Sequence, residues 1–209
     1  MFYKTVVREV IQSIKNIKMT MNMKQLRLFI MAVALTAMPH FAAAQAQQTQ
    51  TAAADLDAKY ATELLKPGTP APDMAVPAID GKSSVTLADY RGKYVVLDFW
   101  ASWCPDCRKD APNVVAMYNK YHEKGVEFLG VSFDTKPESW KKAVETLAIP
   151  YPQVGELKNM RESDMAKAYH ISWIPTVYVI DPQGNVALAT VMSGKVDKLL
   201  NSIFPDCAE

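Results

Sequence analysis

The sequence has few of the residues that build metal centres. Its 209 residues include three cysteines and three histidines. Cys104 and Cys107 have the spacing of half a zinc site, but a structural zinc site needs a second Cys/His pair, and none follows. Six of the eleven methionines lie before residue 39 and the other five are scattered, so a methionine-rich copper protein has no support. We therefore predict no metal site and no bound cofactor.

A long apolar run is also missing. The run from Leu28 to Met38 ends at Pro39, short of the roughly 20 residues that span a bilayer. Lys24 and Arg27 precede it and small residues follow at 42–46, a pattern typical of a secretory signal peptide. We expect a signal peptide over residues 1–46. A complete signal begins at Met23, so residues 1–22 are a candidate for a stretch upstream of the true start of the protein. The alternative to a cleaved signal is an uncleaved N-terminal anchor.

The chain lacks a basic excess. Residues 1–46 carry six basic residues and one acidic residue, which leaves 17 basic and 21 acidic residues in the rest, a net charge of −4. A mildly acidic surface gives no electrostatic footprint for nucleic acid. About 160 residues remain, enough for one domain with its own core.

The remaining chain divides by composition. Residues 47–66 are polar and rich in alanine, which indicates a linker or a short helix around Leu56 to Leu65. Prolines and a glycine at 67–72 break any helix, and the domain is expected to begin there and to extend to residue 205. A tail at residues 206–209 contains Cys207, which we expect to be a mobile, non-catalytic cysteine.

Strand and helix patterns alternate along residues 67–205. Asp80-Gly81 suits a tight turn and predicts a hairpin at the start of the domain. Such an order predicts an α/β fold: a three-layer sandwich in which a central mixed sheet has helices on both faces. The expected strands are 74–79, 84–87, 94–100, 126–133, 176–180 and 186–192; the expected helices begin at 104, 138, 163 and 196.

The two close cysteines lie where the apolar strand 94–100 should end and a helix should begin. A helix N-terminus favours the thiolate, the reactive form of cysteine. We expect Cys104 to attack a substrate disulfide and Cys107 to resolve the mixed disulfide. Asp106 places a negative charge beside Cys104, so the pair should be reducing, nearer the roughly −270 mV of thioredoxin than the −120 mV of DsbA.

From about Gly68 to Ile203 the chain resembles the TlpA/ResA-type thiol-disulfide oxidoreductases, exported members of the thioredoxin superfamily with redoxin or AhpC/TSA-like domains. The motifs that carry the resemblance are Ala71-Pro72-Asp73-Met74, Asp80-Gly81-Lys82, residues 87–93, residues 96–107 and Trp173-Ile174-Pro175-Thr176. The resemblance implies a thioredoxin-like fold and a redox-active disulfide between Cys104 and Cys107. It also implies that the Ile174–Pro175 bond is cis and faces the two cysteines.

Asp98 is unusual because it interrupts an apolar strand, where burial should raise the pKa of its carboxyl group. The resemblance implies that Asp98 moves the proton of Cys107. Gly130 takes the position of the lysine that supports proton transfer in thioredoxin, so a proton route should rely on Asp98 and water. Trp103, Pro105, Asp106, Asp110, Ile174 and Pro175 are expected to support the site, although the aspartate at 110 is shorter than the glutamate of ResA-like proteins.

Two other functions compete with this interpretation. Peroxiredoxins share the fold, but Ala101 takes the place of the threonine that precedes their reactive cysteine by three residues. A copper chaperone that uses Cys104, Cys107 and His170 is the second alternative, since thiolates suit Cu(I).

The resemblance also implies the compartment and the partners of the reaction. It implies a periplasmic reductant, a transmembrane electron donor of the DsbD or CcdA type, and protein clients with misformed disulfides or haem-attachment cysteines. We expect a monomer that reduces protein disulfides in cytochrome c maturation or in general thiol maintenance.

Overall fold

A five-stranded mixed sheet forms the centre of the computed structural model, which describes residues 56–205. The predicted signal peptide and Cys207 lie outside the described residues. The strand order is β5-β4-β3-β6-β7; β3 pairs in parallel with β4 and antiparallel with β6. The five strands are β3 (Tyr94–Trp100), β4 (Val126–Ser132), β5 (Gln153–Gly155), β6 (Thr176–Ile180) and β7 (Val186–Thr190).

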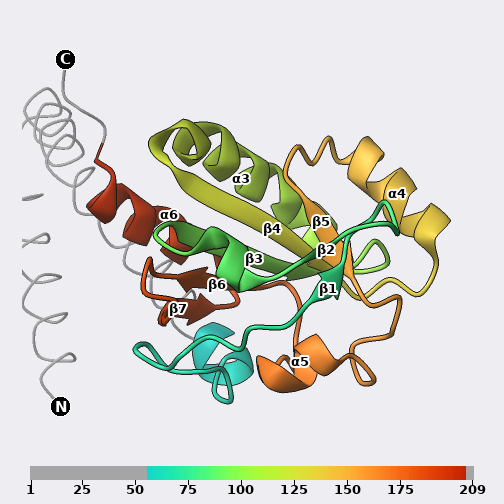
Figure 1. Ribbon diagram of the computed structural model, residues 1–209, viewed down its shortest axis with the longest axis horizontal. Helices are drawn as coiled ribbons and strands as arrows, with labels where there is room; N and C mark the ends of the chain where they lie inside the picture. Colours follow the sequence, from blue (N-terminus) through green and yellow to red (C-terminus); the bar gives the residue numbers. More distant parts are fainter. Residues whose placement is uncertain (1–55, 206–209) are drawn as a thin grey trace, which may run out of the picture. The chain divides into compact units, whose positions relative to one another are not determined.

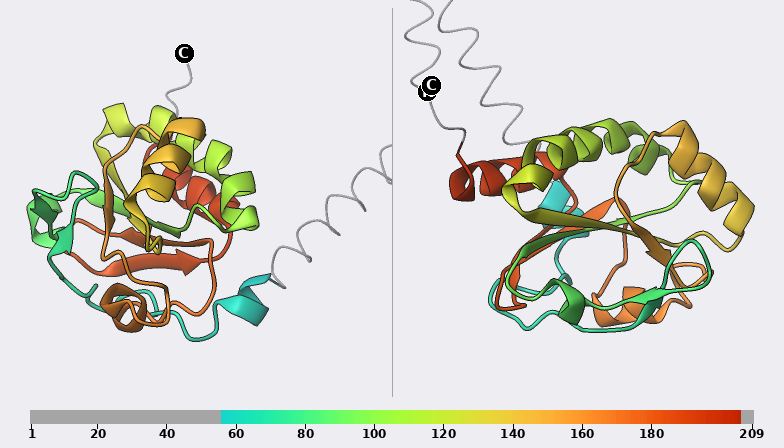
Figure 2. Two further views of the ribbon diagram at one scale, coloured as in Figure 1. Left: turned by 90° about the vertical axis from the view of Figure 1, so that its right-hand side faces the viewer. Right: turned by 45° about the horizontal axis from the view of Figure 1, so that its top comes forward.

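Helices cover both faces of the sheet (Figure 1). α3 (Pro105–Tyr121) and α4 (Pro137–Thr146) each connect parallel neighbours, so right-handed crossovers place both on one face. Figure 2 shows α6 (Ser193–Ile203) on that same face and α5 (Asp164–Ala168) on the other. The predicted three-layer α/β sandwich of the thioredoxin fold is confirmed.

The predicted hairpin is present but short. β1 (Val76–Pro77) pairs antiparallel with β2 (Ser84–Val85), and the Asp80 carboxylate accepts hydrogen bonds from the backbone N–H groups of the turn that joins them. The second strand was expected to reach Leu87, but Leu87–Tyr90 forms a 3-10 helix, η1. Thr86 and Asp89 cap η1 reciprocally, which ends the strand early.

Several other boundaries differ from the prediction by one to five residues. Helix formation at the N-terminal end stops after residues 56–60 instead of reaching Leu65. α6 begins at Ser193 rather than at 196, and β7 ends at Thr190 rather than at 192. The short strand β5 was not expected, and a second short 3-10 helix, η2 (His122–Lys124), follows α3 directly.

The alternation of side chains along β3 determines which residues meet α3. Phe99 packs against Phe133, Tyr169 and Tyr178. The neighbours of Phe99, Asp98 and Trp100, point to the opposite face and line a cavity together with residues of α3. One strand therefore contributes an aromatic core on one face and a carboxyl group on the other.

Candidate active site

The two cysteines form a disulfide at the first turn of α3. Cys104 is the N-cap residue, Pro105 takes the first helical position, and the two cysteine Cα atoms are 5.3 Å apart. The Cys107 backbone N–H donates to Cys104 Sγ at 3.1 Å. Proline suits this position because its missing N–H is not needed there. The same N–H group and the helix dipole would stabilise a thiolate on Cys104 after reduction.

The segment before β6 lies against the disulfide from a distant part of the chain. The Ile174–Pro175 peptide bond is cis, and the Ile174 carbonyl oxygen lies 3.7 Å from Cys104 Sγ. Thr176 Oγ1 donates to the Trp173 carbonyl oxygen at 2.7 Å, which fixes the backbone around Pro175. The fold thus brings together the two motifs that lie 70 residues apart in the sequence.

Exposed groups surround the nearly buried disulfide. Cys104 and Cys107 are each 4% exposed, whereas Trp103 is 57% exposed. Trp173 is 36% exposed and stacks on Tyr60 with ring centroids 4.1 Å apart. Trp103 is therefore part of the surface around the disulfide, in contrast to Trp100, which is buried in the core.

Asp98 is buried beneath the disulfide. The residue is 6% exposed, and burial raises the pKa of its carboxyl group to about 7. A hydrogen bond from the Tyr151 hydroxyl group to Oδ2, at 2.9 Å, lowers this pKa, and the negative charge of Asp110 raises it. Near neutral pH, Asp98 therefore exists as a mixture of carboxylic acid and carboxylate, which allows it to exchange a proton.

Asp98 and Cys107 line one small cavity with Asp110 and Pro175. The volume of this cavity is about 10 Å³, room for a single water molecule. Asp110 lines this cavity although it is an aspartate, and its Oδ1 also accepts hydrogen bonds from Ser193 at 2.6 Å and from Asn113 at 2.8 Å. The structure thus gathers two carboxyl groups and the second cysteine around one space.

Two polar residues of this site were missed by the sequence analysis. Tyr151 binds Asp98, and Gln153 Oε1 accepts a hydrogen bond from Trp100 Nε1 at 3.0 Å. Both residues precede or open β5, the strand that was also missed. No local pattern marks them, because their roles depend on the pairing of β5 with β4.

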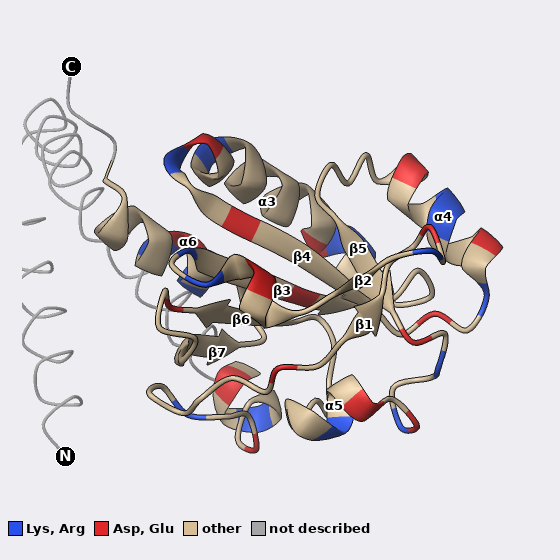
Figure 3. Cartoon of the chain, in the orientation of Figure 1, with Lys and Arg blue, Asp and Glu red and all other residues tan. Residues whose placement is uncertain are grey.

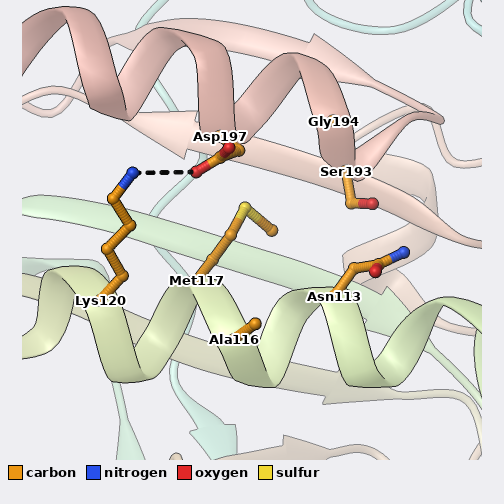
Figure 4. Close-up of a pocket in the computed structure, with 7 residues that line it drawn as sticks. All are labelled: Asn113, Ala116, Met117, Lys120, Ser193, Gly194 and Asp197. Carbon is orange, nitrogen blue, oxygen red and sulfur yellow. Dashed lines mark ion pairs between the residues drawn. The ribbon is translucent and has the colours of Figure 1, made fainter.

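Two surface hollows lie along α3, and the first begins beside the disulfide at Asp106 and Pro175. One, of about 290 Å³, is lined by Asp106, Pro175 and Leu56, among others. The other, of about 420 Å³, lies between α3 and α6, where Lys120 and Asp197 form an ion pair across it (Figure 4). Both hollows include Asn113, Ser193 and Gly194, so they adjoin each other. Together they form a groove that leads away from the disulfide.

Charge does not mark a binding face on the described elements. Figure 3 shows acidic and basic residues interspersed over the helices and loops. Within residues 56–205, no three His, Cys, Asp or Glu side chains gather as a possible metal site. His170 Nδ1 lies 3.0 Å from the Glu63 carbonyl oxygen, and His122 stacks on Tyr118. No helix in this range has the length and apolarity needed to cross a membrane.

A mixed sheet with a Cys-x-x-Cys disulfide directly after its central strand defines a thiol-disulfide oxidoreductase of the thioredoxin fold. The thioredoxin domain of a thiol-disulfide oxidoreductase from Bacteroides vulgatus is similar to this chain, with a TM-score of 0.58 and 34% identity, covering 66% of this chain and 99% of that one. A thiol:disulfide interchange protein from a Bacteroides species has a TM-score of 0.61 and 32% identity, covering 69% and 94%.

Relatives by sequence agree with this class. The thiol-disulfide oxidoreductase ResA of Geobacillus kaustophilus is 32% identical over 141 residues, 66% of this chain and 78% of the relative. The ResA of Oceanobacillus iheyensis is 32% identical over 153 residues, 68% and 76% of the two chains. The AhpC/TSA family model matches residues 67–189. The chain belongs to the AhpC/TSA family.

Proposed function

We propose that this chain is an exported, periplasmic reductant of protein disulfides, with Cys104 as the nucleophile and Cys107 as the resolving cysteine. One observation carries the proposal: Cys104 Sγ caps α3, accepts the Cys107 N–H, and lies 3.7 Å from the Ile174 carbonyl oxygen. A sulfur at a helix N-terminus with a backbone donor is stabilised as the thiolate, which is the attacking species in disulfide exchange.

The reaction has two exchange steps. In the first, the Cys104 thiolate attacks one sulfur of the client disulfide, a mixed disulfide forms, and a client thiolate leaves. In the second, Cys107 loses its proton and attacks Cys104 Sγ, so the Cys104–Cys107 disulfide forms and the second client thiolate leaves. The client gains two electrons and the enzyme dithiol loses them.

Asp98 is the proton acceptor for Cys107 in this scheme. It borders the same cavity as Cys107, and its pKa of about 7 leaves part of it ionised at neutral pH. A water molecule in the cavity would connect the two groups if they do not touch. Burial keeps the pKa of Asp98 high, and the negative charge of Asp110 raises it further.

The client would approach over Trp103, Pro105 and Asp106, which are exposed at the start of α3. Ile174 and Pro175 form the opposite wall of the disulfide, and the groove lined by Asp106 and Pro175 offers room for a segment of the client. Clients are proteins with misformed disulfides or with the haem-attachment cysteines of apocytochromes c.

Electrons must be resupplied for a second turnover, because each cycle leaves Cys104 and Cys107 oxidised. In an oxidising periplasm no soluble reductant pool does this. We propose a transmembrane donor of the DsbD or CcdA type and a monomeric enzyme.

A trapping experiment tests the proposed function. Cys107→Ser cannot resolve the mixed disulfide, so clients should accumulate on Cys104 as adducts that dithiothreitol releases. Cys104→Ser is the matched control and should capture nothing, while Cys207→Ser should reduce insulin disulfides like the unmodified protein. Absence of disulfide reduction by the unmodified protein, together with rapid consumption of hydrogen peroxide, would instead favour a peroxidase.

A further inference from the structure

The position on β4 opposite Asp98 has no room for a cationic side chain. In the register of β3 and β4, Asp98 lies opposite Gly130. A Cβ atom at Gly130 would come within 2.2 Å of Gln153 Nε2, so the Gln153 amide takes the space that a side chain at 130 would need. A lysine at this position could not be accommodated without displacing Gln153.

Gln153 is itself held by two hydrogen bonds. Trp100 Nε1 donates to its Oε1 at 3.0 Å, and its Nε2 donates to the Tyr151 carbonyl oxygen at 3.3 Å. The amide therefore links β3, which carries Asp98, to the backbone of Tyr151. This link holds the backbone of Tyr151 in place relative to β3.

The Tyr151 ring is buried among other aromatic rings. The residue is 3% exposed, and its ring lies 5.9 Å from that of Phe128 and 5.7 Å from that of Tyr118. Its hydroxyl group then donates to Asp98 Oδ2 at 2.9 Å. Burial and the nearby carboxylates keep the pKa of this phenol far above its usual value, so it remains a donor throughout the working pH range.

The titratable groups that face Asp98 are Tyr151, Asp110 and Cys107. Among the described hydrogen-bond partners and cavity-lining residues of Asp98, there is no lysine or arginine. The carboxylate form of Asp98 thus depends on one neutral donor. A hydrogen bond to the charged form favours that form.

We propose that Tyr151 is the positioning residue of the proton acceptor: its hydroxyl group holds the Asp98 carboxylate beside Cys107, in place of a cation on β4. The inference rests on the proposed role of Asp98 and assigns Tyr151 no contact with the client. Loss of the hydroxyl group should make Asp98 harder to ionise and should shift proton transfer from Cys107 to higher pH.

The test separates the two exchange steps. The reduced protein is mixed with 5,5′-dithiobis(2-nitrobenzoate), which releases one chromophoric thiolate on attack by Cys104 and a second on resolution by Cys107. Stopped-flow absorbance from pH 5.5 to 9 then gives a pH midpoint for resolution. Tyr151→Phe should raise that midpoint by about one pH unit and leave the first release unchanged.

Tyr118→Phe is the matched control, because it removes a hydroxyl group from the same aromatic cluster without touching the bond to Asp98. An equal shift in Tyr118→Phe, or no shift in Tyr151→Phe, would overturn the inference. If Tyr151→Phe folds poorly, the Asp98 carboxyl carbon is titrated by NMR in the Gln153→Met variant, which loosens the backbone anchor of Tyr151. The Asp98 midpoint should rise there too, and an unchanged midpoint would count against the inference.

Asp98→Asn distinguishes this inference from the proposed function. If Asp98→Asn keeps the pH profile of the unmodified protein, the role of Asp98 fails and the inference fails with it. If Asp98→Asn alters the profile while Tyr151→Phe does not, only the positioning role of Tyr151 is wrong.

Discussion

Asp134 holds Ser102 in place two residues before the reactive cysteine. Asp134 Oδ2 accepts the Ser102 backbone N–H at 2.9 Å, and Oδ1 accepts the Ser102 hydroxyl group at 2.5 Å. Asp134 lies just beyond β4 and is 2% exposed, and Ser132 Oγ donates to the same carboxylate at 2.8 Å. The loop that leads from β3 to Cys104 is thus fixed to the end of the neighbouring strand.

Removal of this anchor should cost both stability and rate. Asp134→Ala leaves the half-buried donors of Ser102 and the buried hydroxyl group of Ser132 without their acceptor, and we expect a loss of about 2–4 kcal/mol in the free energy of unfolding. The looser loop should also slow the first exchange step several-fold. Urea denaturation and stopped-flow release of the first thiolate measure the two effects. Ser102→Ala removes one of the donors and should cost about 1 kcal/mol; equal losses in both variants would contradict the anchoring role.

Asp98 should make the stability of the oxidised protein fall as pH rises. The pKa of its carboxyl group is 3.8 when unfolded and about 7 when folded, so folding favours the protonated form. The stabilising contribution is complete below pH 4 and is lost as pH rises toward 7. Relative to the unmodified protein, Asp98→Asn should therefore gain about 2.5 kcal/mol between pH 5 and pH 8.

Denaturation of the oxidised proteins at these two pH values checks this expectation. Glu123→Gln, at an exposed position in η2, is the control and should show no such gain. A constant difference between Asp98→Asn and the unmodified protein at both pH values would show that the Asp98 carboxyl group titrates normally.

Much of the fold could be predicted because long apolar runs are favourable only in the protein interior. β3 and β6 have the bounds expected from the sequence, since Val95 to Phe99 and Val177 to Ile180 must be buried. The position of Cys104 at a strand-to-helix junction was predicted for the same reason and is confirmed. Strong local patterns specify these elements without reference to tertiary contacts.

The polar partners of the site could not be predicted in this way. β5 has three residues, follows Pro152, and forms because Gly130 to Ser132 and Ala78 offer it pairing partners. Tyr151 reaches Asp98 across 53 residues of sequence. Such contacts depend on the packed sheet, so the composition and spacing of residues near Tyr151 give no sign of them.

Asp57 should keep the first described residues, 56–68, against the sheet. Its carboxylate accepts the Thr190 hydroxyl group and the Val191 N–H, at 2.8 and 2.9 Å, and forms an ion pair with Lys195. Asp57→Ala should raise amide hydrogen exchange in residues 61–68 at least tenfold and leave β3 and β4 unchanged. Mass spectrometry of peptic peptides measures this. Asp73→Ala removes a carboxylate that binds Leu87 instead, and equally fast exchange of residues 61–68 in that control would contradict the assignment.

Asp106 should set the disulfide on the reducing side. It is exposed in the first turn of α3, next to Pro105 and between the two cysteines. Its negative charge opposes a thiolate on Cys104, which destabilises the reduced form and lowers the potential. We expect a potential near −270 mV, and Asp106→Asn should raise it by about 10–30 mV, because solvent screens an exposed charge.

Redox titration in glutathione or dithiothreitol buffers, with alkylation of the free thiols, gives these potentials. Glu123→Gln removes an acidic charge beyond the far end of α3 and should leave the potential unchanged. A potential above about −180 mV would make the pair an oxidant by comparison with protein disulfide isomerase. In that case electrons would flow from client thiols to the Cys104–Cys107 disulfide, and the proposed direction of the reaction would be reversed.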